Sequence, residues 1–127
     1  DLAVADSGWM VLLWRALGGA PLPRHSGLRL MQTVLKRPEF RQPGRVFWIM
    51  PTAADAARNL GWLQQQGHAL TEADLYVAPL YGSGEIDDPV LVAQLRERRP
   101  TIIMIAIGGG VQERLGLALR AALPQAT

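Results

Sequence analysis

The amino-acid sequence predicts an α/β protein, a Rossmann-like three-layer sandwich with a mostly parallel sheet. Short apolar segments rich in β-branched residues alternate along the chain with segments whose apolar residues recur every three or four positions. Turns containing glycine or proline separate the two kinds of segment. Hydrophobic residues make up 49% of the 127 residues, which is enough for one core, so we expect a single domain over residues 1–127.

The chain opens with a predicted strand and an apolar helix. Residues 2–5 end the strand, and Asp6 or Ser7 caps a helix that runs to about Leu17 and closes at Gly18. This helix is apolar nearly all round. That pattern predicts either deep burial of the helix or a contact between subunits; in the second case the protein is a homo-oligomer.

The middle of the chain predicts a helix, a loop, a strand and another helix. The second helix begins at residue 26 or 27, and a polar, proline-containing loop follows over residues 37–45. Residues 46–50 form a short apolar strand. The helix over residues 53–66 is expected to face the core with Ala57, Leu60 and Leu63.

The third strand, over residues 75–78, leads through a loop over residues 79–88 into a helix that has Pro89 in its first turn. Asp87 or Asp88 caps this helix. Two adjacent aspartates can also hold a metal, but a cap followed by a first-turn proline explains this pair better.

The last strand, residues 101–107, is almost entirely apolar and is predicted to be buried. Three glycines and the pair Gln112-Glu113 follow it, and the final helix has one apolar side made of Val111, Leu115, Ala118, Leu119 and Ala122. Gly108, Gly109 and Gly110 either let a phosphate approach the helix start or form a tight turn that packs helix against strand. The spacing matches neither the Walker loop nor Gly-x-Gly-x-x-Gly.

Charge and composition exclude few functions. Thirteen basic and eleven acidic residues give a net charge of +2, which argues neither for nor against nucleic acid. The absence of cysteine excludes disulfides and thiolate metal sites, and His25 and His68 lie too far apart in sequence to suggest zinc.

The longest apolar run, residues 9–14, is far below the ~20 residues of a membrane helix. The chain begins without Met, so we expect a piece of a longer protein, truncated at both ends.

Candidate site residues lie where ligands bind in such folds, beyond the carboxyl ends of the strands. Asp6 directly follows the first strand and is either a helix cap or a general base. Arg24 is either a solvated side chain or a bidentate partner of phosphate. The loop that contains Tyr81 either covers a ligand or merely turns.

Four segments, in this order, resemble the WecG/TagA/CpsF glycosyltransferases: VADSGWMVLLWRALGGAPLPRHSGLRLM, RVFWIMPTAADAARNLGWLQQQG, LYVAPLYGSG and IAIGGGVQERLG. The resemblance implies inverting transfer of an N-acetylmannosamine-type or related sugar from a UDP donor to an undecaprenyl-diphosphate-linked acceptor, in the synthesis of cell-surface polysaccharide or teichoic acid. It implies a UDP-sugar co-substrate, no metal or other cofactor and no nucleic-acid partner. The expected location is cytoplasmic, at the inner face of the plasma membrane, which the enzyme contacts through segments outside this chain.

Carried over by residue, the resemblance makes Asp6 the catalytic base and Arg24 the cation that neutralises the leaving UDP diphosphate. The remaining substrate-binding residues that it implies are Ser26, Tyr81, Gly108, Gly109, Gly110, Gln112 and Glu113. The Gly-x-Pro-x-Gln-Glu form common in the family appears here as Gly109-Gly110-Val111-Gln112-Glu113, which leaves the identity of the donor sugar open. The alternative hypothesis is a non-catalytic Rossmann-like domain that binds a nucleotide or takes part in assembly. A dinucleotide-dependent oxidoreductase is disfavoured by the glycine spacing.

Overall fold

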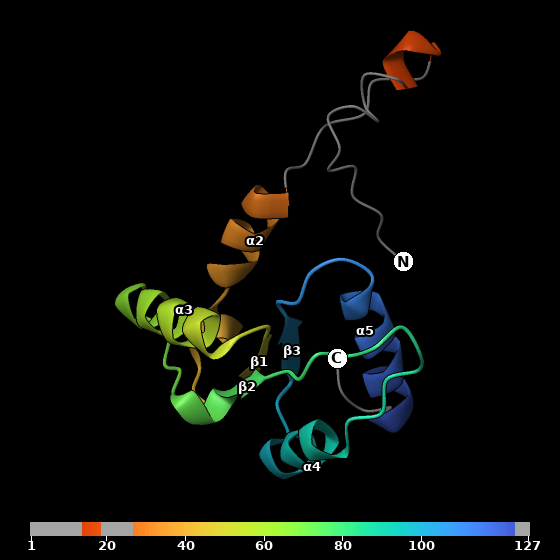
Figure 1. The fold of residues 1–127 in the computed structure, drawn as a ribbon. Helices are drawn as coiled ribbons and strands as arrows, with labels where there is room; N and C mark the ends of the chain where they lie inside the picture. Colours follow the sequence, from red (N-terminus) through yellow and green to blue (C-terminus); the bar gives the residue numbers. More distant parts are fainter. Residues whose placement is uncertain (1–13, 19–26, 124–127) are drawn as a thin grey trace. The chain divides into compact units, whose positions relative to one another are not determined.

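The computed structural model of the chain describes residues 14–18 and 27–123 (Figure 1). The chain divides into two compact units, Asp1–Arg37 and Pro38–Thr127. The expected single domain stays a prediction.

In the first unit, the structure describes the end of one helix and the whole of the next. Residues 14–16 are helical, and Gly18 has a φ of 77° and donates its N–H to the carbonyl oxygen of Arg15 at 3.1 Å. This is the helix end that the glycine predicted. Helix α2 (Gly27–Leu35) confirms the second predicted helix. Trp14 and Leu17, from the first helix, are 47% and 76% exposed, so deep burial does not extend to these two positions.

The second unit contains a parallel sheet of three strands in its described part, with the order β2-β1-β3. Strand β1 (Val46–Met50) is buried at every residue because it lies between β2 (Leu75–Val77) and β3 (Ile102–Ile105). This full burial explains why the sequence of β1 is continuously apolar. The last predicted strand is correctly placed but shorter than expected, and it is half-buried because β3 lies at an edge of the described sheet.

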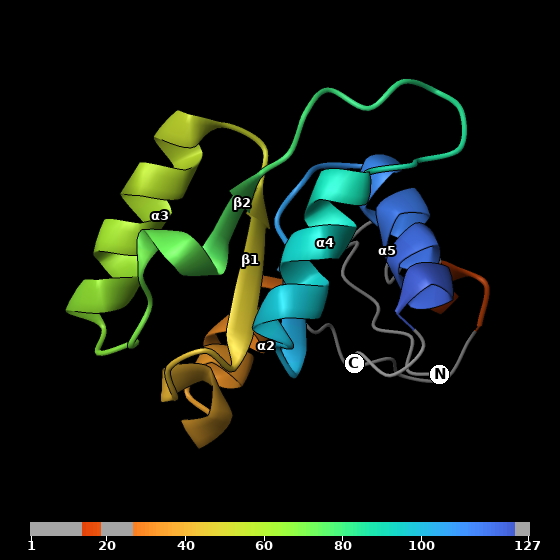
Figure 2. The same ribbon diagram turned by 90° about the horizontal axis from the view of Figure 1, so that it is seen from below.

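Three helices cover the two faces of the sheet, as the α/β prediction required (Figure 2). Helix α3 (Ala53–Gln65) joins β1 to β2 on one face, and α4 (Pro89–Arg98) and α5 (Val111–Ala122) lie on the other. Leu63 of α3 is buried and Leu60 is half-buried, but Ala57 is exposed, so its predicted inward orientation is wrong. The loop predicted over residues 37–45 contains a short 3₁₀ helix, Pro38–Arg41, because Phe40 turns inward and is buried.

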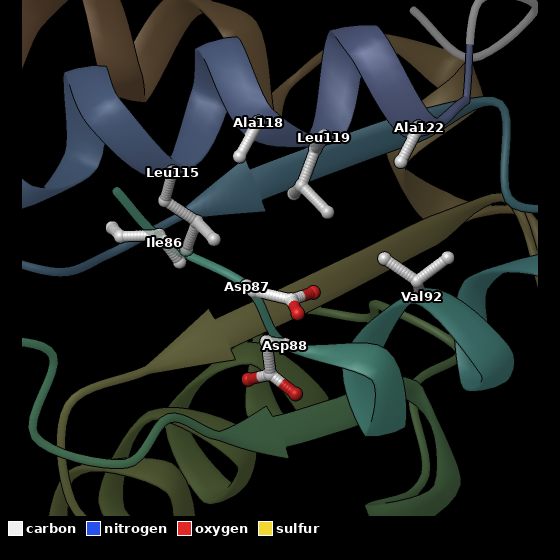
Figure 3. A pocket seen from close by; sticks show the side chains of 8 residues that line it. All are labelled: Ile86, Asp87, Asp88, Val92, Leu115, Ala118, Leu119 and Ala122. Carbon is white, nitrogen blue, oxygen red and sulfur yellow. The ribbon is translucent and has the colours of Figure 1, made fainter. Parts of the chain in front are cut away.

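Helices α4 and α5 leave a small cavity between them, about 60 Å³ in volume (Figure 3). Apolar side chains of both helices line it, and Asp87 and Asp88 lie at one end. The space is about that of a water molecule or two, so it is a packing gap and not a ligand site.

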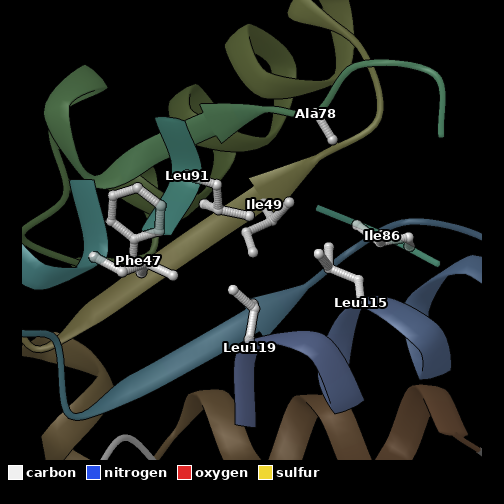
Figure 4. Packing of buried hydrophobic residues seen from close by; sticks show 8 residues of the cluster. Phe47, Ile49, Ala78, Ile86, Leu91, Leu115 and Leu119 are labelled. Atoms are coloured by element: carbon white, nitrogen blue, oxygen red, sulfur yellow. The ribbon is translucent and has the colours of Figure 1, made fainter. Parts of the chain in front are cut away.

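The core on this side of the sheet joins β1 to both helices (Figure 4). Phe47 and Ile49 alternate along β1 toward the helices, where they meet Leu91 and Leu95 of α4 and Leu115 and Leu119 of α5. Both α4 and α5 are therefore held against the strand whose end opens onto the candidate site.

Candidate functional site

Three loops meet at one edge of the sheet because all three strands are parallel. Backbone hydrogen bonds extend the pairing past the ends of the strands: the N–H of Ala78 donates to Met50 and the N–H of Ala106 donates to Ile49, both at 2.9 Å. The loops after β2 and β3 therefore begin beside the end of β1. This is the edge at which ligands were expected.

The chain leaves neighbouring strands toward opposite faces at this edge. From β1 it turns into α3 on one face, and from β3 it turns into α5 on the other (Figure 2). Parallel sheets bind ligands at such a switch point, where diverging loops open a crevice. At this switch point Pro51 and Thr52 follow β1, and residues 106–110 follow β3.

Three helices begin at this edge, and two of them have a side-chain cap. The Thr52 hydroxyl accepts the N–H of Asp55 at 3.0 Å to cap α3, and the Asp88 carboxylate accepts the N–H of Leu91 at 3.0 Å to cap α4. The N-cap of α5 is Gly110, which has no side chain to offer. The N-cap position of α5 therefore supplies no side-chain cap. The N–H groups of Gly110 and Glu113 instead meet the carboxylate of Glu113, and the positive end of the helix dipole faces the edge.

Only one of the three glycines before α5 has a backbone conformation that favours glycine. Gly110 has a φ of 76°, a backbone conformation that disfavours any residue with a Cβ. Gly108 and Gly109 do not have positive φ, and a Cβ at either position would meet no atom within 4 Å. The backbone thus explains Gly110 as a turn residue. The other two glycines leave open space in front of the helix start.

This difference makes a stability prediction. Gly110→Ala is expected to lower the free energy of unfolding by about 1–2 kcal/mol, because alanine resists the positive φ. Gly108→Ala and Gly109→Ala are expected to leave it unchanged or raise it by up to about 1 kcal/mol, because they only restrict the unfolded chain. Urea unfolding of the three variants measures the difference, and equal losses in all three would contradict the assignment of roles.

Gln112 and Glu113 lie in the exposed first turn of α5. The Gln112 side-chain amide donates from Nε2 to Glu113 Oε1 at 3.1 Å. The pKa of the Glu113 carboxyl is lowered by this bond and by the backbone N–H groups of Glu113 and Gly110. Glu113 is therefore a carboxylate that fixes the amide of Gln112, whose Oε1 is left to accept a hydrogen bond from a ligand.

Tyr81, predicted to bind substrate, contacts a buried carboxylate. Its hydroxyl donates to Asp88 Oδ2 at 2.6 Å, and the hydroxyl of Tyr76 donates to the same oxygen at 2.9 Å. Burial alone would raise the pKa of Asp88. Hydrogen bonds from Tyr81, the Leu91 N–H and Tyr76 outweigh burial and lower that pKa. Burial and these contacts with Asp88 raise the pKa of Tyr76 to about 12 and raise that of Tyr81 as well.

The predicted site residues fall into three groups. Gly108, Gly109, Gly110, Gln112 and Glu113 come together on one turn. Tyr81 lies on the loop between β2 and α4, where its hydroxyl contacts Asp88. Asp6, Arg24 and Ser26 lie outside the described residues, so their predicted roles stay predictions.

Sequence reasoning missed two polar contacts at this edge. It gave Asp87 or Asp88 as the cap of α4 and weighed the pair as a metal site. The spacing of Tyr76 did not indicate that its hydroxyl donates to the Asp88 carboxylate. It also missed Arg114, whose guanidinium donates to the carbonyl oxygen of Gly84. A contact between two loops depends on the tertiary fold and leaves no local pattern.

The described residues contain no group of three or more His, Cys, Asp or Glu side chains able to hold a metal. Nδ1 of His68 donates to the carbonyl oxygen of Phe40 at 2.9 Å, so this buried histidine has a structural partner. Within the same described part, no helix combines the length and the hydropathy that a membrane span requires.

Comparison with known proteins gives one family. The model of the glycosyl transferase WecG/TagA/CpsF family matches residues 1–127, the whole chain. Neither the curated proteins nor the solved structures gave a match.

Proposed function

The chain belongs to the WecG/TagA/CpsF family of glycosyl transferases, and we propose that it transfers a sugar from a UDP donor to a lipid-linked acceptor. The donor sugar is of the N-acetylmannosamine type or related to it. The acceptor is a sugar carried on undecaprenyl diphosphate, and the product enters cell-surface polysaccharide or teichoic acid. The reaction takes place at the cytoplasmic face of the membrane.

The observation that supports this proposal most is the open turn before α5. The backbone conformation does not require glycine at positions 108 and 109, and the N-cap residue of the helix behind them, Gly110, has no side chain. Backbone N–H groups and the helix dipole at such a position suit an anionic oxygen of the UDP diphosphate. Close approach of the diphosphate explains why side chains are missing there.

In the proposed reaction, Asp6 takes the proton from the acceptor hydroxyl as its oxygen attacks the anomeric carbon of the donor. The new bond joins the acceptor oxygen to that carbon, and the bond from the carbon to the UDP oxygen breaks with its electron pair going to UDP. One displacement inverts the configuration, so no covalent intermediate is needed. Arg24 neutralises the charge that grows on the leaving diphosphate, without a metal ion, and Ser26 binds beside it.

Gln112 holds the donor through its amide, which Glu113 orients. The Nε2 group of Gln112 donates a hydrogen bond to Glu113, which leaves Oε1 of Gln112 as an acceptor. An acceptor suits a hydroxyl or acetamido N–H of the sugar better than a phosphate oxygen. The charge of Glu113 also disfavours a phosphate at that spot. We therefore assign the glycine turn to the diphosphate and the Gln112-Glu113 pair to the sugar.

Calorimetric titration of the full-length protein with UDP, and separately with NAD, tests this function. We expect saturable binding of UDP and none of NAD. Gly108→Ala and Gly109→Ala should weaken UDP binding at least about tenfold, because a Cβ fills the space that the diphosphate needs. Gly61→Ala is the matched control, because its Cβ also meets no atom within 4 Å but lies in α3, away from the turn.

Binding of NAD instead of UDP would indicate a dinucleotide-dependent enzyme. Binding of UDP with no transfer from a UDP-sugar to a lipid-linked acceptor would indicate a nucleotide-binding domain without catalysis. Each outcome contradicts the proposal in a different way.

A further inference from the structure

The loop over residues 79–88, called here the β2–α4 loop, passes close to the start of α5. It leaves the end of β2, reaches across to α5 and returns to α4 (Figure 2). Two of its residues are anchored: Tyr81 by its hydrogen bond to Asp88, and Ile86 by burial against Leu115 of α5. Between these anchors lie four exposed residues, 82–85, which form the tip of the loop.

Arg114 connects this tip to α5. Its guanidinium donates to the carbonyl oxygen of Gly84, from the position directly after Glu113. Neither Gly82 nor Gly84 has positive φ, and a Cβ at either would meet no atom within 4 Å, so packing does not fix the tip. The hydrogen bond from Arg114 holds a segment that is otherwise flexible by composition.

Arg114 lies on a different side of α5 from Gln112. Residues two apart on a helix point to nearly opposite sides, so Arg114 points away from the side that carries Gln112. Its polar contact is with the loop backbone. The side chain can therefore act on a bound donor through the loop, and not by contact with the sugar that Gln112 holds.

We propose that Arg114 is a positioning residue for the nucleotide-sugar site, because it holds the tip of the β2–α4 loop beside the first turn of α5 as one wall of that site. This inference rests on the proposed function. A wall that is ordered before the donor arrives removes part of the entropy cost of binding. The planar guanidinium, with several N–H groups in a fixed geometry, suits a carbonyl on a mobile backbone better than an ammonium group does.

The test compares Arg114→Gln with Arg120→Gln in the full-length enzyme. Both variants lose one positive charge from α5, but the exposed Arg120 lies in the last turn, far along the helix from the loop. We expect Arg114→Gln to raise the KM for the UDP-sugar about threefold to tenfold and to leave kcat within about twofold. The reason is that the loop tip is no longer ordered before the donor binds, whereas the groups that carry out the chemical step are unchanged. Arg114→Lys should recover part of the loss.

Hydrogen exchange of the amides of residues 82–85 gives a readout that activity does not. Exchange should be faster in Arg114→Gln than in the wild type and in Arg120→Gln. Unchanged exchange, or a KM equal to that of Arg120→Gln, would overturn the proposal. A weaker binding of UDP with unchanged exchange would mean that Arg114 touches the diphosphate directly, which also overturns it. Failure of the wild type to bind UDP would instead contradict the proposed function. The exchange result would still test whether Arg114 holds the tip of the β2–α4 loop.

Discussion

Replacing Asp6 by Asn in the full-length enzyme is expected to lower kcat for sugar transfer by about 10²–10⁴-fold. Asparagine has nearly the same shape but cannot take the proton from the attacking hydroxyl. Because the carboxylate is proposed to act on the acceptor and not on the nucleotide, the affinity for UDP should stay within about twofold. Initial rates at saturating donor and acceptor, together with UDP calorimetry, measure the two quantities.

Asp87→Asn is the matched control, because Asp87 is an exposed carboxylate in the β2–α4 loop and has no part in the proposed reaction. It should keep the wild-type rate. A wild-type rate for Asp6→Asn would show that another group takes the proton. An equal loss of UDP affinity and rate would show that Asp6 serves binding or folding, as in the simpler interpretation of this residue as a helix cap.

Replacing Asp88 by Ala is expected to lower the free energy of unfolding by about 3 kcal/mol. The loss of the cap of α4 accounts for about 1 kcal/mol of this. The rest comes from the hydrogen bonds that the hydroxyls of Tyr76 and Tyr81 make to a charged group, typically about 1.5–3 kcal/mol when such a partner is removed. Urea unfolding measures the change. Asp87→Ala, one residue away and exposed, should stay within about 0.5 kcal/mol of the wild type.

The dependence of this loss on pH has a definite sign. The folded protein lowers the pKa of Asp88, so the carboxylate contributes its stability above the usual Asp range near pH 4 and loses it as the pH falls below that range. Wild type and Asp88→Ala should therefore converge in stability at acid pH. A gap that stays constant down to low pH would show that shape, and not charge, stabilises the loop.

The two tyrosines report the same network at alkaline pH. They are the only tyrosines in the chain, so its phenolate absorbance arises from them alone. Because the folded pKa of Tyr76 is raised to about 12, the stability that its neutral form contributes is lost between about pH 10, where a free tyrosine ionises, and pH 12. In Asp88→Ala the ionisation should move down toward pH 10, but not fully, since burial remains.

Most of the fold could be predicted from local patterns in the sequence. The continuous apolar run of β1, the cap and proline at the start of α4, and the apolar side of α5 each identify their element without reference to the rest of the chain. Burial was predicted less well. Ala57 is exposed because the prediction placed the inward face of α3 one position away from where it lies. Strand β3 is half-buried because the sequence of a strand does not show whether the strand lies at the centre or at an edge of the sheet.

The candidate site could be predicted only where its residues lie on one short segment. The glycine turn and the pair Gln112-Glu113 are adjacent in sequence, so their juxtaposition follows from a single strand–turn–helix pattern. The contacts of Asp88 with two tyrosines and of Arg114 with Gly84 were not predictable, because they join residues up to 30 positions apart through the tertiary fold. For Tyr81 the family resemblance supplied a role, and the structure adds a partner that no spacing indicated.

Helix α5 belongs at once to the interior of the protein and to the proposed donor site. Leu115 and Leu119 lie in the core, and the amide of Gln112 lies less than one turn away from the first of them. Because a helix moves as a rigid body, a smaller side chain in the core beneath α5 would shift Gln112 relative to a sugar bound in the proposed site. Selection for a different donor can therefore act on aliphatic residues that no substrate touches, and variants that look like stability mutants should also differ in sugar preference.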